Sequence, residues 1–268
     1  MEKMFFLSLA SGSSGNCYYL GTQSFGILVD AGIGVRQIKK TLKDNGIGFE
    51  QIMAVLVTHD HADHIKSVGQ LGESLNIPVF ATERVHAGIL RSRYVSEVLT
   101  LSKRVIEKET PFDIKDFKIT AFDVPHDSSD NVGYCIEYNK HTFVIVTDAG
   151  HITDAISRYA EKANHLVFEA NYDREMLMNG AYPQVLKERV SSGTGHLSNN
   201  DAAEFLAKLF SPKLQNIWLC HLSRENNHPE LAVKTVDFRL LQEGIKVGKD
   251  VSLTALKRMT PSEMYVLT

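Results

Sequence analysis

The chain has 268 residues, of which 43% are hydrophobic and 23% are charged, a composition typical of a soluble globular protein. The formal net charge of -3 excludes a global positive field, so a polyanion would have to bind through metal ions or a local basic patch. The three cysteines are odd in number and far apart, which argues against a disulfide framework, and we expect them to be buried free thiols.

The N-terminus carries no recognisable targeting segment. Its apolar run, residues 4–10, is too short for a signal peptide and is followed by Ser and Gly. No stretch approaches the roughly 18 apolar residues of a membrane span. We therefore expect a cytoplasmic protein without membrane contact. The lack of repeats, low-complexity segments and linkers predicts a single domain over residues 1–268.

The first part of the chain is rich in predicted strands. Short apolar runs between Gly, Ser and Asn turns predict strands at residues 4–10, 17–20, 25–30 and 53–58. Apolar residues at positions 35, 38 and 42, followed by Gly46, predict an amphipathic helix over residues 35–45.

The second part repeats this order of strands and helices. Further strands are predicted at residues 118–124, 132–138, 142–147, 165–169 and 216–220. Helices are predicted at residues 153–163, 198–210 and 229–243. The order favours an α+β fold in which two sheets pack together with helices outside, a four-layer αβ/βα sandwich, although the same periodicity also fits a doubly wound sheet.

The segment after the 53–58 strand has the highest density of metal-binding side chains in the chain. Thr58-His59-Asp60-His61-Ala62-Asp63-His64 places three imidazoles and two carboxylates within six residues. In extended backbone His59 and His61 point the same way and can bind one ion. A turn into a helix would carry Asp63 and His64 toward a second ion. The segment therefore predicts a metal site.

The pattern H-x-H-x-D-H resembles the signature of the metallo-β-lactamase superfamily, and three further motifs follow it in that superfamily's order. They are Pro125-His126-Asp127, Thr147-Asp148-Ala149-Gly150 and Leu219-Cys220-His221, each at a strand end. The resemblance covers residues 4–225 and implies the metallo-β-lactamase sandwich. It also implies one ion held by His59, His61 and His126, a second held by Asp63, His64 and His221, and Asp148 bridging them. Asp60 and Asp127 are expected to orient imidazoles.

Two divalent ions, of Zn, Mn or Fe, suit these ligands, and no organic cofactor is expected. A metal-bridged hydroxide would attack the substrate, and Asp63 would orient it or take its proton.

A second set of motifs is similar to the phosphodiesterase branch of the superfamily, which includes tRNase Z-type enzymes. It consists of Glu169-Ala170-Asn171-Tyr172, Gly195-His196-Leu197-Ser198 and His221-Leu222-Ser223-Arg224. The resemblance implies that Glu169 holds His196, which acts as the general acid. Phe168, where the tRNase Z pattern has His, and the lack of a long exosite arm argue against tRNA processing.

With Ser11-Gly12-Ser13-Ser14-Gly15-Asn16 near the N-terminus, these motifs closely resemble the YycJ (WalJ) family of exonucleases, which degrade DNA from the 5′ end. The resemblance implies a metal-dependent phosphodiesterase, specifically a 5′→3′ exodeoxyribonuclease with DNA as its substrate. Contacts to the substrate are expected from Ser11, Ser13, Asn16, Asn171 and Arg224.

Three other functions compete with this interpretation. A small-molecule ester, thioester or lactam hydrolase of the same fold would have an apolar pocket and no Glu169–His196 pair. A metal-binding module without catalysis is disfavoured by the complete ligand set. Redox chemistry on two irons is disfavoured by His61, where the flavo-di-iron pattern has Glu, and by the lack of a flavin domain.

Overall fold

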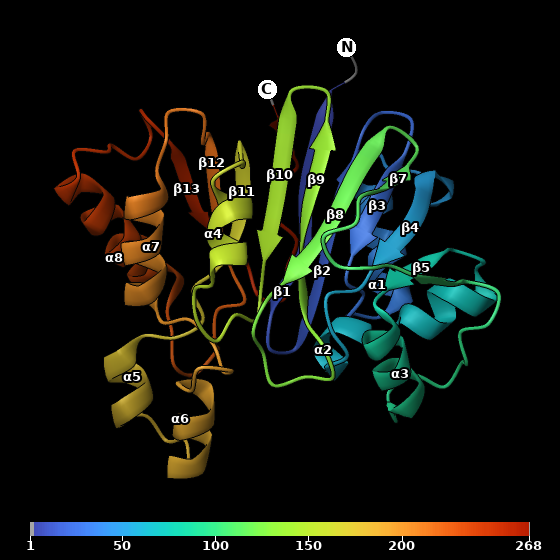
Figure 1. Ribbon diagram of the computed structural model, residues 1–268, viewed down its shortest axis with the longest axis horizontal. Coiled ribbons are helices and arrows are strands. Elements are labelled where there is room, and N and C mark those ends of the chain that lie inside the picture. The colour runs from blue at the N-terminus through green and yellow to red at the C-terminus, as the bar shows by residue number, and fades with distance from the viewer. Residues whose placement is uncertain (1–2, 268) are drawn as a thin grey trace. The chain divides into compact units, whose positions relative to one another are not determined.

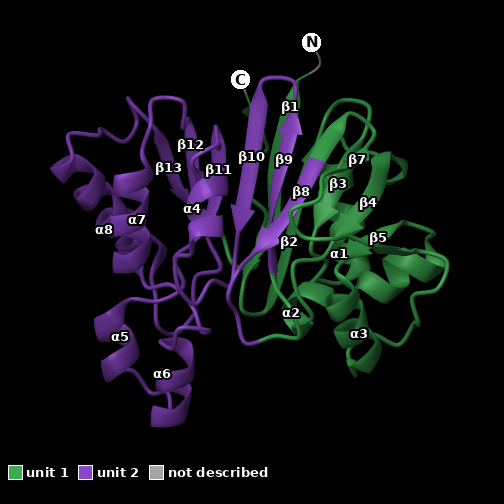
Figure 2. Ribbon diagram, in the orientation of Figure 1, with its two compact units in different colours: residues 1–118, 128–131, 257–268 green, residues 119–127, 132–256 purple. Residues whose placement is uncertain are grey.

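The computed structural model describes residues 3–267, which form two seven-stranded sheets flanked by helices. The chain divides into two compact units, coloured in Figure 2. Unit 1 contains the residues up to Lys118, Ser128–Asn131 and the residues from Lys257 on. Unit 2 contains Ile119–Asp127 and Val132–Leu256. Both sheets mix parallel and antiparallel pairs, which confirms the predicted α+β class.

The first sheet has the strand order β14-β1-β2-β3-β4-β5-β6, of which Figure 1 labels β1 to β5. Its strands are β14 (Tyr265–Leu267), β1 (Met4–Gly12), β2 (Gly15–Gly21), β3 (Gly26–Val29), β4 (Ile52–Leu56), β5 (Val79–Ala81) and β6 (Lys103–Val105). A two-residue turn joins β1 to β2, with Gly12 opposite Gly15. The β3–β4 pair is parallel, so its connection needs a crossover, which contains α1 (Val35–Asp44).

The helices of unit 1 bury one apolar face each. Besides α1 they are α2 (Ala62–Ile65) and α3 (Glu83–Arg91), with short helical turns at Phe49–Gln51 and Gln70–Ser74. Ile38 and Leu42 of α1 lie in the same buried cluster as residues of β1 and β4. The helix predicted at 35–45 is confirmed, and Gly46 follows it with a φ of 75°, the left-handed conformation that favours glycine after a helix.

The second sheet has the strand order β13-β12-β11-β10-β9-β8-β7. Its strands are β13 (Ser252–Ala255), β12 (Asn216–Cys220), β11 (His165–Glu169), β10 (His141–Val146), β9 (Val132–Tyr138), β8 (Phe117–Asp123) and β7 (Phe112–Ile114). The strands β10, β11, β12 and β13 are parallel, so their carboxyl ends meet at one edge of the sheet. This edge carries most of the polar motifs of unit 2.

Helices lie in each of the connections between these parallel strands. They are α4 (Asp154–Ala160), α5 (Arg174–Asn179), α6 (Gln184–Val190), α7 (Asn199–Leu209) and α8 (Pro229–Gln242). Apolar residues of α4, α7 and α8, among them Ile156, Leu206 and Val236, form one buried cluster with residues of β10 to β12. The side chains of Thr153 and Ser198 cap α4 and α7 by accepting a backbone N–H. No helix within residues 3–267 is long and apolar enough to cross a membrane.

The loop after β3 passes very close to the backbone of Asp63. The Gly32 N–H donates to Asn16 O over 2.8 Å, and a Cβ atom at position 32 would lie 1.6 Å from the carbonyl oxygen of Asp63. Only glycine therefore allows the metal-binding motif and this loop to pack at the observed distance.

We predict that Gly32→Ser lowers the free energy of unfolding by about 1–3 kcal/mol, because the backbone of Asp63 must shift to make room. Gly34→Ser is the matched control, since a Cβ at position 34 meets nothing within 4 Å and serine is a favoured helix N-cap. Urea unfolding of both variants measures the difference. Equal stabilities would contradict the close approach.

Candidate metal centre

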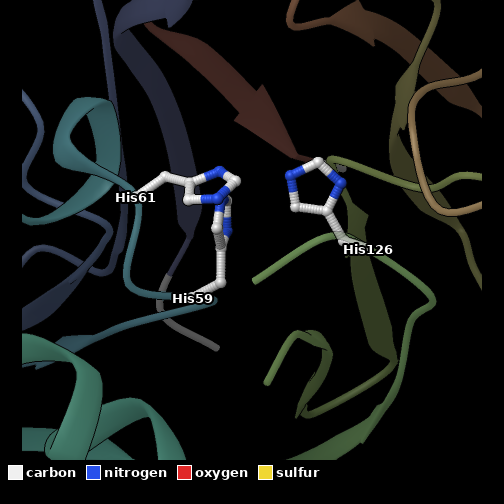
Figure 3. Close-up of side chains that lie close together, drawn as sticks. All are labelled: His59, His61 and His126. Atoms are coloured by element: carbon white, nitrogen blue, oxygen red, sulfur yellow. The ribbon is translucent and has the colours of Figure 1, made fainter. Parts of the chain in front are cut away.

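Unit 1 contributes three imidazoles that lie against one another at the end of β4. The ring centroids of His59 and His61 are 4.7 Å apart, and those of His59 and His64 are 4.1 Å apart. His61 has extended backbone and α2 begins at the next residue, so the expected turn into a helix after His61 is confirmed. Figure 3 draws the rings of His59 and His61 of unit 1, and that of His126, which belongs to unit 2.

A buried carboxylate, Asp30, orients His64. It accepts a hydrogen bond from His64 Nδ1 over 2.7 Å, and from the backbone N and hydroxyl of Thr58 over 2.8 and 2.9 Å. Because Nδ1 carries this proton, Nε2 of His64 is the nitrogen left to coordinate an ion, and it lies 3.6 Å from Asp63 Oδ2. Asp30 was not predicted from the sequence to be part of this site. Its position directly after the buried strand β3 is the signal that could have identified it.

Asp60 does not orient an imidazole, contrary to the expectation. Its carboxylate accepts hydrogen bonds from the backbone N of Ser129 over 3.0 Å and from the Ser129 hydroxyl over 2.6 Å. Successive side chains of an extended segment point to opposite sides, so Asp60 faces away from the side that His59 and His61 share. It ties the metal-binding motif to the loop at 128–131 instead.

Unit 2 contains a second group of donors, three of which lie at the carboxyl ends of the parallel strands β10, β11 and β12. Asp148, Glu169, His196 and His221 each place one potential ligand atom within 4.8 Å of the others. The Asp148 Oδ1 atom lies 3.3 Å from His221 Nδ1 and 3.7 Å from His126 Nε2. Asp148 and His221 both have left-handed backbone, with φ values of 55° and 54°. Such strain in non-glycine residues is concentrated at functional sites.

Glu169 is the most heavily hydrogen-bonded carboxylate of this group. Its Oε1 lies 2.8 Å from His196 Nδ1 and 3.0 Å from His221 Nδ1, and its Oε2 accepts the backbone N–H groups of Ala149 and Leu197. Burial by itself would raise the pKa of Glu169. The charge of His196 and the hydrogen bonds from both imidazoles outweigh burial and hold the pKa below its usual value. Glu169 is therefore an ionised carboxylate shared by two rings.

His126 is oriented by the backbone. Its Nδ1 lies 3.0 Å from the carbonyl oxygen of Gly195, which can only accept, so Nδ1 carries the proton and Nε2 can coordinate. Asp127 Oδ1 lies 3.4 Å from the same Nε2, and Asp127 Oδ2 pairs with Arg189 of α6. The arginine therefore holds Asp127 beside the imidazole.

The three predicted substrate contacts near the N-terminus differ in their exposure to solvent. Ser11 is fully buried and hydrogen-bonded to the hydroxyl of Tyr18, and Ser13 is exposed in the β1–β2 turn. Asn16 is fully buried, with its Nδ2 2.9 Å from His64 Nε2 and 3.3 Å from Asp63 Oδ2. The contacts of Asn16 are therefore to Asp63 and His64, two of the predicted metal ligands, within its own unit.

The expected contacts in unit 2 differ in the same way. Asn171 is buried, and its Nδ2 donates to the carbonyl oxygen of His221 over 2.7 Å. Arg224 is exposed, three residues after His221. The side chain of Arg224 is open to a polyanion, whereas that of Asn171 is engaged with the His221 backbone. Substrate contact stays a prediction for all five residues.

The donor chemistry of both groups fits a divalent transition metal. Each unit offers imidazole nitrogens and carboxylate oxygens, which suit Zn, Mn and Fe. The imidazoles of His64, His126 and His221 are oriented by hydrogen bonds from Nδ1, as metal-binding histidines almost always are by their second nitrogen.

Comparison with known proteins identifies the family. Residues 26–217 match the β-lactamase superfamily domain. The chain is 37% identical to exodeoxyribonuclease WalJ of Streptococcus pneumoniae, over 90% of each chain. It is 34% identical to exodeoxyribonuclease YycJ of Bacillus anthracis, over 91% of this chain and 92% of that one. The chain belongs to the WalJ/YycJ family of the β-lactamase superfamily. The resemblance in the sequence motifs is thereby confirmed.

Solved structures agree on the fold of this WalJ/YycJ family member. The metallo-β-lactamase fold protein YhfI of Bacillus subtilis matches with a TM-score of 0.73 at 16% identity, over 99% of this chain and 100% of that one. The predicted metallo-β-lactamase fold is confirmed.

We predict that Asp30→Asn lowers zinc affinity about 10- to 100-fold, because an amide cannot accept all three hydrogen bonds and no longer fixes the His64 ring. The lost acceptor should also reduce the free energy of unfolding by about 1–3 kcal/mol. Competition with a chromogenic chelator measures the affinity. Asp44→Asn, which removes only an exposed pair with Lys40, is the control and should behave as wild type. Unchanged zinc affinity in Asp30→Asn would contradict the role of Asp30.

Proposed function

We propose that this protein is a metal-dependent phosphodiesterase, specifically a 5′→3′ exodeoxyribonuclease that hydrolyses DNA. The observation that carries the proposal is its identity of 37% and 34%, over about nine-tenths of the chain, to two proteins named exodeoxyribonucleases. The Glu169–His196 pair, at 2.8 Å, supports a phosphodiesterase over a small-molecule ester, thioester or lactam hydrolase, which would not need it.

The proposed centre holds two divalent ions of Zn, Mn or Fe. One would be held by His59, His61 and His126, the other by Asp63, His64 and His221, with Asp148 between them. Support comes from the oriented imidazoles of each unit and from the complete set of ligands at strand ends. A bound pair of ions would supply a nucleophile at neutral pH and neutralise charge on the phosphate. Asp63 would orient that nucleophile or take its proton.

His196 would act as the general acid. Its Nδ1 is bonded to the buried carboxylate of Glu169, which fixes the orientation of the ring. The side chain of His196 is 19% exposed, so the ring reaches solvent and its Nε2 can deliver a proton to a leaving oxygen. The alkoxide leaving group of a DNA phosphodiester is a poor one and needs that proton.

The proposed setting is the cytoplasm. The three cysteines, Cys17, Cys135 and Cys220, are buried free thiols, as is usual for proteins of a reducing compartment. Exposed Arg224 near His221 is the proposed contact to the DNA backbone.

We predict that the protein loaded with Mn²⁺ or Zn²⁺ degrades 5′-labelled DNA, releasing the label early as a short product, and that the rate falls steeply with salt. Chelation of the metal should abolish the activity. Asp63→Ala should lower turnover at least about 100-fold while the protein stays folded. Gel analysis of the products measures both. Turnover of a chromogenic lactam or a thioester, with DNA left intact, would refute the proposal in favour of a small-molecule hydrolase.

For His196→Ala we predict a loss of about 10²- to 10⁴-fold on DNA and a much smaller loss on bis(p-nitrophenyl) phosphate, whose leaving group needs no proton. His151→Ala, which removes an exposed ring bonded only to the Gly193 carbonyl oxygen, is the control. Equal losses on the two substrates would show that His196 is not the acid.

A further inference from the structure

Two buried asparagines of unit 2, Asn199 and Asn227, form a reciprocal pair. Asn199 is the first residue of α7, and Asn227 lies in the loop between β12 and α8. The Asn199 Nδ2 donates to Asn227 Oδ1 over 2.9 Å, and the Asn227 Nδ2 donates to Asn199 Oδ1 over 2.8 Å. The two residues are 0% and 3% exposed, so neither amide exchanges these bonds for water.

The neighbours of Asn227 fix the orientation of both amides. The backbone N–H of His228 donates to Asn227 Oδ1 over 2.9 Å, which requires an oxygen there. The Asn227 Nδ2 lies 2.9 Å from Ala170 O and 3.0 Å from Asn171 O, and carbonyl oxygens require a donor. Since Asn227 can be placed in one orientation only, the amide of Asn199 is fixed as well.

This pair connects three segments that carry the chemistry of unit 2. Asn227 holds the carbonyl oxygens of Ala170 and Asn171, just after Glu169. The backbone N–H of Asn199 donates to Tyr172 O over 2.8 Å, and Asn199 follows His196 by three residues. Asn227 itself lies six residues after His221 on the third segment.

Asn171 carries the connection to the site. Its backbone N–H donates to Leu197 O over 2.9 Å, and its carbonyl oxygen accepts the N–H of Ser223 over 2.7 Å. Its Nδ2 holds the carbonyl oxygen of His221, the residue whose backbone is left-handed. A displacement of Asn171 would therefore move the His221 ring and the loop that presents His196.

We propose that Asn199 and Asn227 are positioning residues, which hold the rings of His221 and His196 within hydrogen-bond distance of Glu169. The inference rests on the proposed function for what the two rings do, but the geometry it concerns lies wholly within unit 2. The two amides bond to each other and to backbone groups of Ala170, Asn171 and His228, so the pair acts on the polar loops. Loss of either amide leaves its partner buried without its reciprocal bonds.

The test uses Asn199→Ala, Asn227→Ala, the double variant, and Asn200→Ala as the matched control. Asn200 is the next residue of α7 and is exposed. Asn227→Asp, which keeps the size and removes the donor, covers the case in which Asn227→Ala does not fold. Thermal unfolding first establishes that each variant is folded at the assay temperature.

Two measurements on the folded variants do not depend on nuclease activity. Zinc affinity, by chelator competition, should fall about 10- to 100-fold in each single variant, and no further in the double variant, since the pair acts as a unit. The downfield NMR signal of the ring proton shared by His196 and Glu169 should shift or disappear. Asn200→Ala should leave both unchanged.

A third measurement links the pair to the reaction. If His196 is displaced, the activity on DNA should fall at least 10-fold more than that on bis(p-nitrophenyl) phosphate. Variants that lose only thermal stability, with zinc affinity, the NMR signal and the substrate ratio of wild type, would overturn the inference. If the wild type itself does not cleave phosphodiesters, the proposed function fails, whereas zinc affinity and the NMR signal still decide the role of the pair.

Discussion

The arrangement of the polar loops of unit 2 depends on the hydrogen bonds that the buried carboxylate of Glu169 accepts. It receives two imidazoles on one oxygen and two backbone N–H groups on the other. A buried carboxylate is stable only when its charge is compensated, so the loops that bring these donors must close around it. The parallel strands β10, β11 and β12 make this possible, because their carboxyl ends present residues 148, 169 and 221 along one edge.

Unit 1 has a comparable buried carboxylate, Asp30. It accepts hydrogen bonds from Thr58, which lies after the adjacent parallel strand β4, and from His64 of α2. Each unit thus uses one fully buried acid to orient imidazoles of the candidate site, His64 in unit 1 and His196 and His221 in unit 2. Loss of a partner that orients a metal-binding imidazole typically lowers metal affinity about 10- to 100-fold. The close approach at Gly32 brings Asn16 and the backbone of Asp63 together in the same unit.

The sequence predicted well wherever apolar runs are long and bounded by turn residues. The strand at 132–138 has the bounds of β9, and the helix at 198–210 differs from α7 by its two cap residues. It did not predict β6, Lys103–Val105, since a mostly exposed strand of three residues has no apolar pattern to detect. The candidate metal ligands were predicted from motifs that occur in the order typical of the superfamily and that are rich in His and Asp. Asp30 was not predicted because a single acidic residue after a strand is also common in ordinary turns. The prediction for Asp60 was wrong because it relied on closeness in sequence and did not consider that successive side chains of an extended segment point to opposite sides.

Three site residues, Asp30, Asp148 and His221, share a left-handed backbone within two residues of the end of a strand. Glycine would adopt this conformation at lower cost, yet glycine has no carboxylate or imidazole to offer. Natural selection for foldability and selection for the ligand set therefore pull these three positions in opposite directions. A substitution by glycine would relieve the strain and stabilise the fold, but it would remove a side chain of the candidate metal site. Left-handed backbone at a non-glycine residue therefore indicates a position kept for its chemistry and not for folding.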